Sequence, residues 1–159
     1  MSFIRFLLLL CLIVWLGGIV FFGAVMAPTL FAVLPSRNLA GSVVNPTLNT
    51  LHWIGLFCGL IFLACSVLHD YVTKGDFRLV SARHFLVVLM LTVTATLLFA
   101  VTPKMAALRA QIGVIDNVPA SDPLRVQFNA LHVWSTRMEG AVLLLGLGVV
   151  LSLARRTEW

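Results

Sequence analysis

Four long apolar runs, separated by short polar connections, constrain this chain more than any other feature of its sequence. A helix of about 20 apolar residues spans the roughly 30 Å hydrocarbon core of a bilayer. The runs cover residues 3–27, 48–72, 79–102 and 132–154. Because each run can cross a membrane as a helix, we predict an all-α fold in which one transmembrane domain of 159 residues forms a four-helix bundle.

The composition agrees with this fold class. Hydrophobic residues make up 60% of the chain and charged residues 11%, whereas soluble domains carry about 25% charged residues. The formal net charge of +5 comes from basic residues at the ends of the apolar runs, where they act as anchors and topology signals. The lipid bilayer is therefore the predicted partner, and nucleic acid is not.

Prolines mark the ends of the first and third spans. Pro28 and Pro103 bend or end a regular helix, because proline lacks a backbone donor and clashes with the preceding turn. Beyond the spans we expect amphipathic helical extensions over residues 28–35, 104–112 and 123–131.

Two connections have distinct predicted forms. Residues 41–50, which contain Pro46, are predicted to form a loop. The stretch Ser121-Asp122-Pro123 is typical of a helix start, with a capping residue before a proline at the first helical position.

Basic residues also predict the orientation. One side of the membrane would carry Arg5, Lys74, Arg78, Arg83, Arg155 and Arg156, and the other Arg37, Lys104, Arg109, Arg125 and Arg137. The first group is more tightly clustered against the spans, so we predict a bacterial-type inner (plasma) membrane protein with both termini in the cytoplasm. His69 and His84 would then flank spans on the cytoplasmic side, and His52 and His132 would lie toward the outer face.

Two short stretches suggest an internal repeat. Residues 48–52 (LNTLH) and 128–132 (FNALH) share Asn, Leu and His in register, and each stands at the start of an even-numbered span. We therefore predict two pseudo-repeated helical hairpins around an axis along the membrane normal. This symmetry would bring His52 and His132 to similar depth, and would align Glu139 with Gly59, where the glycine leaves room for a carboxylate.

Polar residues inside the spans form a candidate set. Ionisable residues within a membrane span are functional hypotheses by default, and Glu139 shares one helical face with Ser135 and His132. Thr92 and Thr96 share a face of the third span, where their hydroxyls can bond backbone carbonyls or a neighbouring helix. In the second span, one small and polar face is predicted to point inward; it comprises Leu48, His52, Gly55, Gly59, Leu63 and Ser66.

The two histidines near the outer face leave two interpretations open. They can be interfacial anchors. Alternatively, His52 and His132 can ligate a copper ion or the iron of a haem, with haem b as the candidate cofactor. In that case Arg109 and Arg137 would bind the haem propionates through bidentate hydrogen bonds.

Two motifs resemble those of a known family. The first is Trp15-x-Gly17-Gly18-x-x-Phe21-Phe22 followed by Ala27-Pro28-x-x-Phe31, and the second is Pro103-x5-Arg109 followed by Asp122-x-x-Arg125-x-x-Phe128-x-x-Leu131-His132-x-x-Ser135. In this order they resemble the transmembrane protein 205-like domain family, also called domain of unknown function 4149. The resemblance implies a small four-span membrane protein without an agreed activity; Glu139 stands where the family pattern has Asn. The layout is more distantly similar to bacterial protoporphyrinogen oxidase and copper-resistance membrane proteins, an analogy of fold only.

Three functions remain open from the sequence. The first is a non-enzymatic accessory or small-ligand-binding membrane protein, with a membrane-protein partner or as a homo-oligomer. The second is a haem- or copper-dependent redox protein that uses His52 and His132. The third is a small transporter with a polar path; its residues would be Ser66, Thr92, Thr96 and Glu139. No nucleophile–base pair, glycine-rich phosphate loop or zinc motif is present, so the sequence assigns no reaction.

Overall fold

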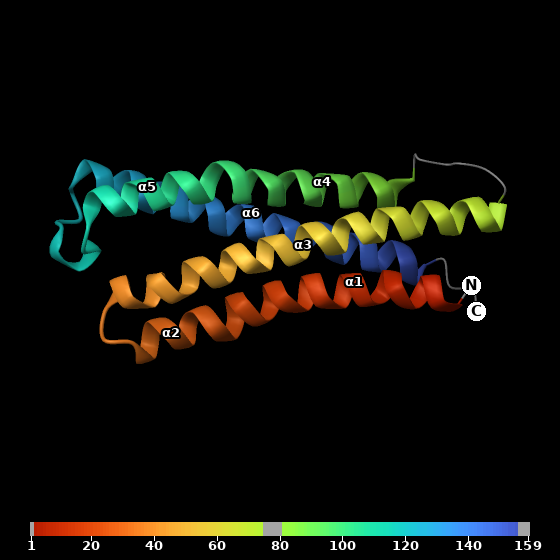
Figure 1. Cartoon of the computed structure of the whole chain (residues 1–159), viewed down its shortest axis with the longest axis horizontal. Coiled ribbons are helices and arrows are strands. Elements are labelled where there is room, and N and C mark those ends of the chain that lie inside the picture. The colour runs from red at the N-terminus through yellow and green to blue at the C-terminus, as the bar shows by residue number, and fades with distance from the viewer. Residues whose placement is uncertain (1, 75–80, 156–159) are drawn as a thin grey trace.

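Each apolar run forms part of a helical rod that is longer than the predicted span. The computed structural model describes residues 2–74 and 81–155, and its four candidate membrane helices cover Phe3–Val33, Arg37–Thr73, Ala82–Ile112 and Pro123–Ala154 (Figure 1). At about 1.5 Å per residue these rods measure roughly 45–55 Å, against about 30 Å for the hydrocarbon core. Their ends therefore extend past the bilayer core, and the predicted all-α four-helix class is confirmed.

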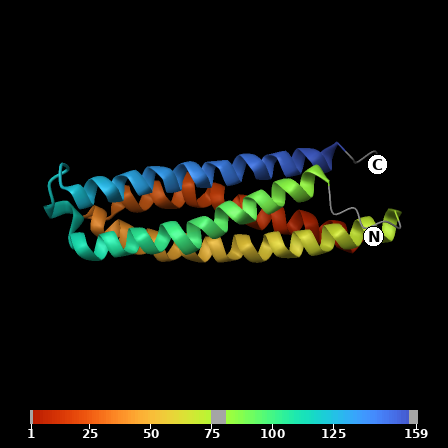
Figure 2. The same cartoon turned by 90° about the horizontal axis from the view of Figure 1, so that it is seen from above.

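The rods alternate in direction, so the first begins and the last ends at the same end of the bundle (Figures 1 and 2). The first rod contains α1 (Ser2–Phe21), the π-helical turn η1 (Phe22–Met26) and α2 (Ala27–Val33), and the second is α3 (Arg37–Lys74). The third contains α4 (Ala82–Thr96), the π-helical turn η2 (Leu97–Val101) and α5 (Thr102–Ile112). A short 3-10 turn, η3 (Ile115–Asn117), leads to the fourth rod, α6 (Pro123–Ala154).

The helices form a closed ring around the interior. Helix α1 packs against α3, α3 against α4, α4 against α6, and α6 against α1. Helices α3 and α6 therefore face each other across the interior. Residues 79–80 of the predicted third span, and Arg78 and Arg156 of the predicted cytoplasmic clusters, lie outside the described residues.

A π-helical turn precedes Pro28 and Pro103 at the same spacing. The first residue of α2 donates its backbone N–H to the carbonyl of Phe22, and the first residue of α5 donates to that of Leu97. These bonds reach five residues back, and the wider turn eases the clash between a proline ring and the preceding turn. The regular helix is interrupted at both prolines, as expected, but each rod continues beyond. The paired turns support the internal repeat with a backbone feature.

The prediction of a loop over residues 41–50 is wrong, because α3 runs through Pro46. Proline removes the donor for the Ser42 carbonyl, but Pro46 lies on the exposed face of the helix. Nearby threonine hydroxyls bond the backbone: Thr47 Oγ1 donates to the Val43 carbonyl at 2.9 Å and Thr50 Oγ1 to the Pro46 carbonyl at 3.0 Å. Tertiary support of this kind lets membrane helices tolerate proline.

The predicted start of the fourth helix is confirmed. Asp122 is the N-cap of α6, and its carboxylate accepts the backbone N–H groups of Leu124 at 2.9 Å and Arg125 at 3.2 Å. Pro123 occupies the first helical position, where its missing donor costs no helical bond.

Trp15 of α1 fills a groove formed by two glycines of α3. The indole is buried, with 2% of the residue exposed. A Cβ atom at Gly55 would lie 2.8 Å from Trp15 Cε2, and one at Gly59 would lie 2.8 Å from Trp15 Cζ3. Real Cβ atoms do not approach neighbours this closely, so both positions must lack a side chain. The groove therefore sets how closely α1 and α3 approach.

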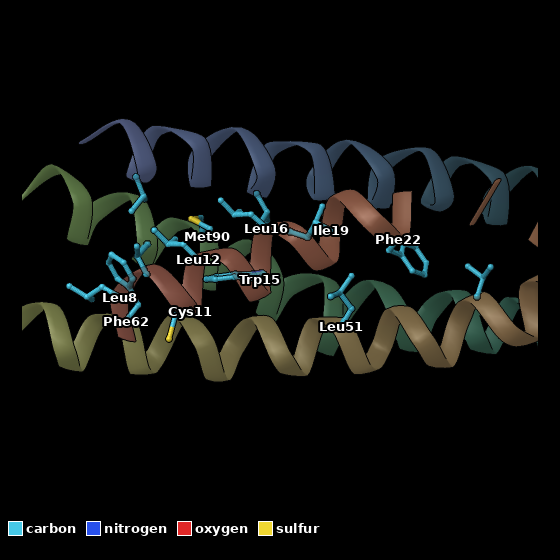
Figure 3. Packing of buried hydrophobic residues seen from close by; sticks show 14 residues of the cluster. Leu8, Cys11, Leu12, Trp15, Leu16, Ile19, Phe22, Leu51, Phe62 and Met90 are labelled. Atoms are coloured by element: carbon cyan, nitrogen blue, oxygen red, sulfur yellow. The ribbon is translucent and has the colours of Figure 1, made fainter. Parts of the chain in front are cut away.

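The predicted inward face of the second span is confirmed, although one of its expected contacts is wrong. His52, Gly55, Gly59 and Ser66 are all buried. Gly59, however, makes room for Trp15 and Leu91 and not for Glu139, because the closely packed neighbour of α3 is α1. Figure 3 shows the buried residues of α1, with Leu16 and Ile19 on the side that faces α6.

Adding a methyl group in the groove is expected to destabilise the bundle. Gly55→Ala should lower the free energy of unfolding by about 1–3 kcal/mol, because the buried Trp15 ring has little space into which it can move. The measurement is reversible unfolding in mixed micelles followed by circular dichroism. Gly17→Ala is the matched control, since a Cβ there meets nothing within 4 Å. Equal stability of the two variants would contradict the groove's role.

Candidate functional site

His52 and Glu139 meet across the interior of the bundle. His52 Nε2 lies 3.0 Å from Glu139 Oε2, and the two side chains are 2% and 18% exposed. Their helices, α3 and α6, are opposite members of the ring, so the bond spans the diagonal of the bundle. Sequence analysis selected both residues but did not pair them, because it aligned His52 with His132 and Glu139 with Gly59.

The surroundings of His52 indicate which partner carries the charge. Nδ1 of His52 is buried and has no hydrogen-bond partner among the described residues. A protonated imidazole would therefore bury an N–H group without an acceptor, which costs free energy. A neutral His52 whose Nε2–H donates to Glu139 Oε2 does not bury that second N–H group; this tautomer is assigned from the hydrogen-bond pattern.

A cavity of about 720 Å³ lies beside Glu139, a volume typical of small-molecule sites. The polar side chains of one wall come from α6, and they are His132, Ser135, Thr136 and Glu139. The opposite wall is apolar and comes mainly from the first rod, with Ile19, Val20, Phe22, Ala24, Ala27 and Phe31. The segments around both prolines border the cavity. Pro28 lines it from the first rod, and Thr102, which directly precedes Pro103, lines it from the third rod.

His132 lines this cavity but does not meet His52. It is exposed, and it precedes Glu139 by seven residues, or about 10 Å along the helix axis. Since Glu139 occupies His52 Nε2, the two imidazoles as placed do not bracket one metal ion or one haem iron. Within the described part of the chain no group of three or more His, Cys, Asp or Glu could hold a metal ion. Haem or copper ligation by this pair stays a prediction without support from the geometry.

The two arginines predicted to bind propionates have partners elsewhere. Arg109 of α5 donates to the carbonyl of Asn38 and, at 3.0 Å, to Asn38 Oδ1. Its guanidinium lies over Gly41, where a Cβ would be 3.1 Å from Cζ. Arg109 therefore fastens the first turn of α3 to α5. Arg137 lies on the exposed face of α6, with its guanidinium carbon 5.7 Å from the centroid of the Trp134 ring.

The intramembrane threonines lie away from the cavity. Thr92 Oγ1 donates to the Val88 carbonyl at 2.9 Å and Thr96 Oγ1 to the Thr92 carbonyl at 2.8 Å, so both bond their own helix. Both are exposed, whereas Thr94, which the sequence did not single out, is buried with 2% exposed. Thr92 and Thr96, the two residues of the third span in the predicted polar path, therefore do not line the cavity.

A second polar cluster lies at the end of the bundle where the chain begins. Arg83 Nη2 donates to Asp70 Oδ2, and His84 Nε2 lies 2.8 Å from Ser66 Oγ. All four residues are buried, so the prediction that His84 merely flanks a span is wrong. Counting from the ends of the apolar runs missed this cluster because α3 continues to Lys74 and packs against the start of α4. The opposite charges of Asp70 and Arg83 were the available signal.

The fold and this site define an integral membrane four-helix bundle with a cavity between its helices. The chain belongs to the family described as a domain of unknown function (DUF4149), whose sequence model matches residues 10–113. The match includes Trp15, both π-helical turns and Arg109, and ends before α6. No curated protein and no solved structure matches the chain. The predicted membrane-protein partner or homo-oligomer stays a prediction.

The placement of the histidines predicts the outcome of a spectroscopic test. We expect protein purified from its native membrane in mild detergent to have no Soret band that depends on both histidines, because His52 Nε2 is held by Glu139. The measurement is a visible spectrum before and after reduction, with metal analysis, for the native chain, His52→Ala and His132→Ala. A Soret band or a stoichiometric metal that both substitutions remove would establish bis-histidine ligation instead.

Proposed function

We propose that this protein is a non-enzymatic membrane protein that binds a small amphipathic molecule in the cavity beside Glu139. The observation that carries the proposal is the division of the cavity into a polar α6 wall and an apolar wall from the first rod. A molecule with a polar head and a hydrocarbon body matches both walls. Binding sites of this kind are mostly apolar with a few placed polar groups that fix the orientation of the ligand.

The position of the cavity suits a ligand that arrives from the membrane. Gly23, Pro28 and Gly140 line it and are themselves exposed on the outside of their helices. Apolar side chains such as Val20 and Phe31 stand on the same exposed face of the first rod. A hydrocarbon chain can therefore pass from lipid into the cavity while remaining in contact with apolar groups.

The interior next to the cavity is closed, which favours binding over passage. Trp15, Phe62 and Met90 are buried in the hydrophobic core of the bundle (Figure 3), and none of them lines the cavity. Among the described residues, none takes part both in the hydrogen bond between His52 and Glu139 and in those of the Asp70 cluster. A continuous polar path of the kind expected for a transporter is not formed in this arrangement.

Filling the cavity is expected to abolish binding without unfolding the bundle. A Cβ at Gly140 meets nothing within 4 Å, so Gly140→Phe can place its ring in the cavity. We expect dodecylammonium, dodecanol or dodecanoate, measured by native mass spectrometry from maltoside micelles, to bind on the order of tenfold more weakly to this variant.

Gly17→Phe is the matched control for this experiment. Its Cβ also meets nothing within 4 Å, and Gly17 does not line the cavity, so its affinities should equal those of the native chain. If none of the three amphiphiles binds, or if Gly140→Phe binds all of them as the native chain does, the proposed function is wrong.

We further infer a bacterial-type inner membrane location with both termini in the cytoplasm. The support is the cluster of basic residues at the end where the first rod begins and the last ends, including Arg5, Arg83 and Arg155. The cavity then lies toward the outer half of the bundle. Fluorescent protein fused after the last residue should fluoresce, since it folds in the cytoplasm, whereas a fused periplasmic phosphatase should stay inactive. The opposite pair of results would reverse the orientation.

A further inference from the structure

The cavity contains a negative charge that the protein leaves uncompensated. Glu139 is the one Asp, Glu, Lys or Arg among the described residues that line it. Oε2 of Glu139 accepts from His52, and the described part of the chain provides no hydrogen bond to Oε1. Because the carboxylate remains 18% exposed, it presents an open acceptor to whatever occupies the cavity.

His52 does not neutralise this charge. Because Nδ1 is buried without a partner among the described residues, a neutral imidazole that donates one hydrogen bond from Nε2 fits the site. It therefore fixes the position of the carboxylate. The pair leaves a net negative charge on the cavity wall.

The nearby cations are directed elsewhere. Arg137 precedes Glu139 by two residues on α6 but lies on the exposed face, where its guanidinium stacks on Trp134. Arg109 is held by Asn38 at the start of α3. His132, on the polar wall, is exposed and about two helical turns from Glu139. The described protein groups thus supply no counter-charge at the carboxylate.

We propose that the ligand of this cavity is a cationic amphiphile, an alkylammonium or related amine whose head donates to Glu139 and whose hydrocarbon body lies on the apolar wall. This inference rests on the proposed function and specifies its ligand class. A charge in a low-dielectric site requires a partner, and an ammonium group supplies both the opposite charge and the N–H donors. Ser135 and Thr136 stand next to Glu139 on the same wall and offer hydroxyl acceptors for the remaining N–H groups.

Three probes with one chain length separate head-group recognition from hydrocarbon binding. Dodecylammonium, dodecanol and dodecanoate are titrated at neutral pH into the full chain in phosphatidylcholine nanodiscs, and empty nanodiscs give the background. We expect the native chain to bind dodecylammonium on the order of tenfold more tightly than dodecanol, and dodecanoate most weakly. Glu139→Gln keeps an acceptor for His52 but removes the charge, so the ammonium advantage should fall to about threefold or less while dodecanol binding is unchanged.

A second carboxylate supplies the matched control. Asp116 is exposed, lies outside the cavity lining and accepts the backbone N–H of Asn38 at 3.2 Å. Asp116→Asn removes one negative charge as Glu139→Gln does, and it should retain the full preference for ammonium.

The outcomes distinguish this inference from the proposed function. Equal binding of all three probes, with loss in Gly140→Phe, would overturn the cationic ligand class and leave the proposed function standing. A preference for ammonium that persists in Glu139→Gln would overturn the assignment to this carboxylate. If no probe binds, the proposed function fails as well.

Discussion

The close approach of α1 and α3 is the contact on which the rest of the structure depends. Lipid chains are as apolar as leucine, so helices in a bilayer gain little from hydrophobic burial and associate through close packing. Here the indole of Trp15 lies in the groove that Gly55 and Gly59 leave on α3. A second small residue, Gly146 of α6, does the same for Leu16, since a Cβ there would lie 3.0 Å from Leu16 Cδ1. These contacts close the half of the bundle that contains the chain's first residues.

The other half is more open because of the two proline turns. In each, a π-helical turn followed by proline replaces regular α-helix, and π-helical turns in helices are often found at functional sites. The first rod contributes Phe22, Gly23 and Pro28 to the cavity from this region, and the third rod contributes Thr102. The cavity is thus lined by residues of the first π-helical turn and by the residue that follows the second.

The two buried polar clusters have different consequences. Asp70 and Arg83 form an ion pair deep in the protein, with the side chains 4% and 7% exposed. Removing one partner of such a pair costs about 3–5 kcal/mol, so this cluster fixes how α3 meets α4. Glu139 has a neutral partner and an open oxygen. In the first cluster the two opposite charges lie within the protein, whereas the Glu139 carboxylate has no opposite charge beside it among the described residues.

Several features could be predicted from local sequence. The α6 cap at Asp122 depends on residues adjacent in the chain, and the inward face of α3 follows from helical periodicity. Pro46 predicts a loop because propensity is local, whereas α3 continues through it, with nearby threonine hydroxyls bonded to the backbone of the helix. His84 was placed at a membrane border because the apolar run was counted, although the helices extend beyond it.

The sequence by itself determined the number of spans and the alternation of their directions, because these follow from the apolar runs and the short connections between them. Only the tertiary structure decided which polar residues meet. The pairing of His52 with Glu139 joins helices that are far apart in the chain and opposite in the ring, and depends on how Trp15 and the glycines set the rods relative to one another. Helical periodicity predicts which face of each helix points inward, but not how far one helix is shifted along its axis relative to another. That shift is what brings a carboxylate to the wall of the cavity.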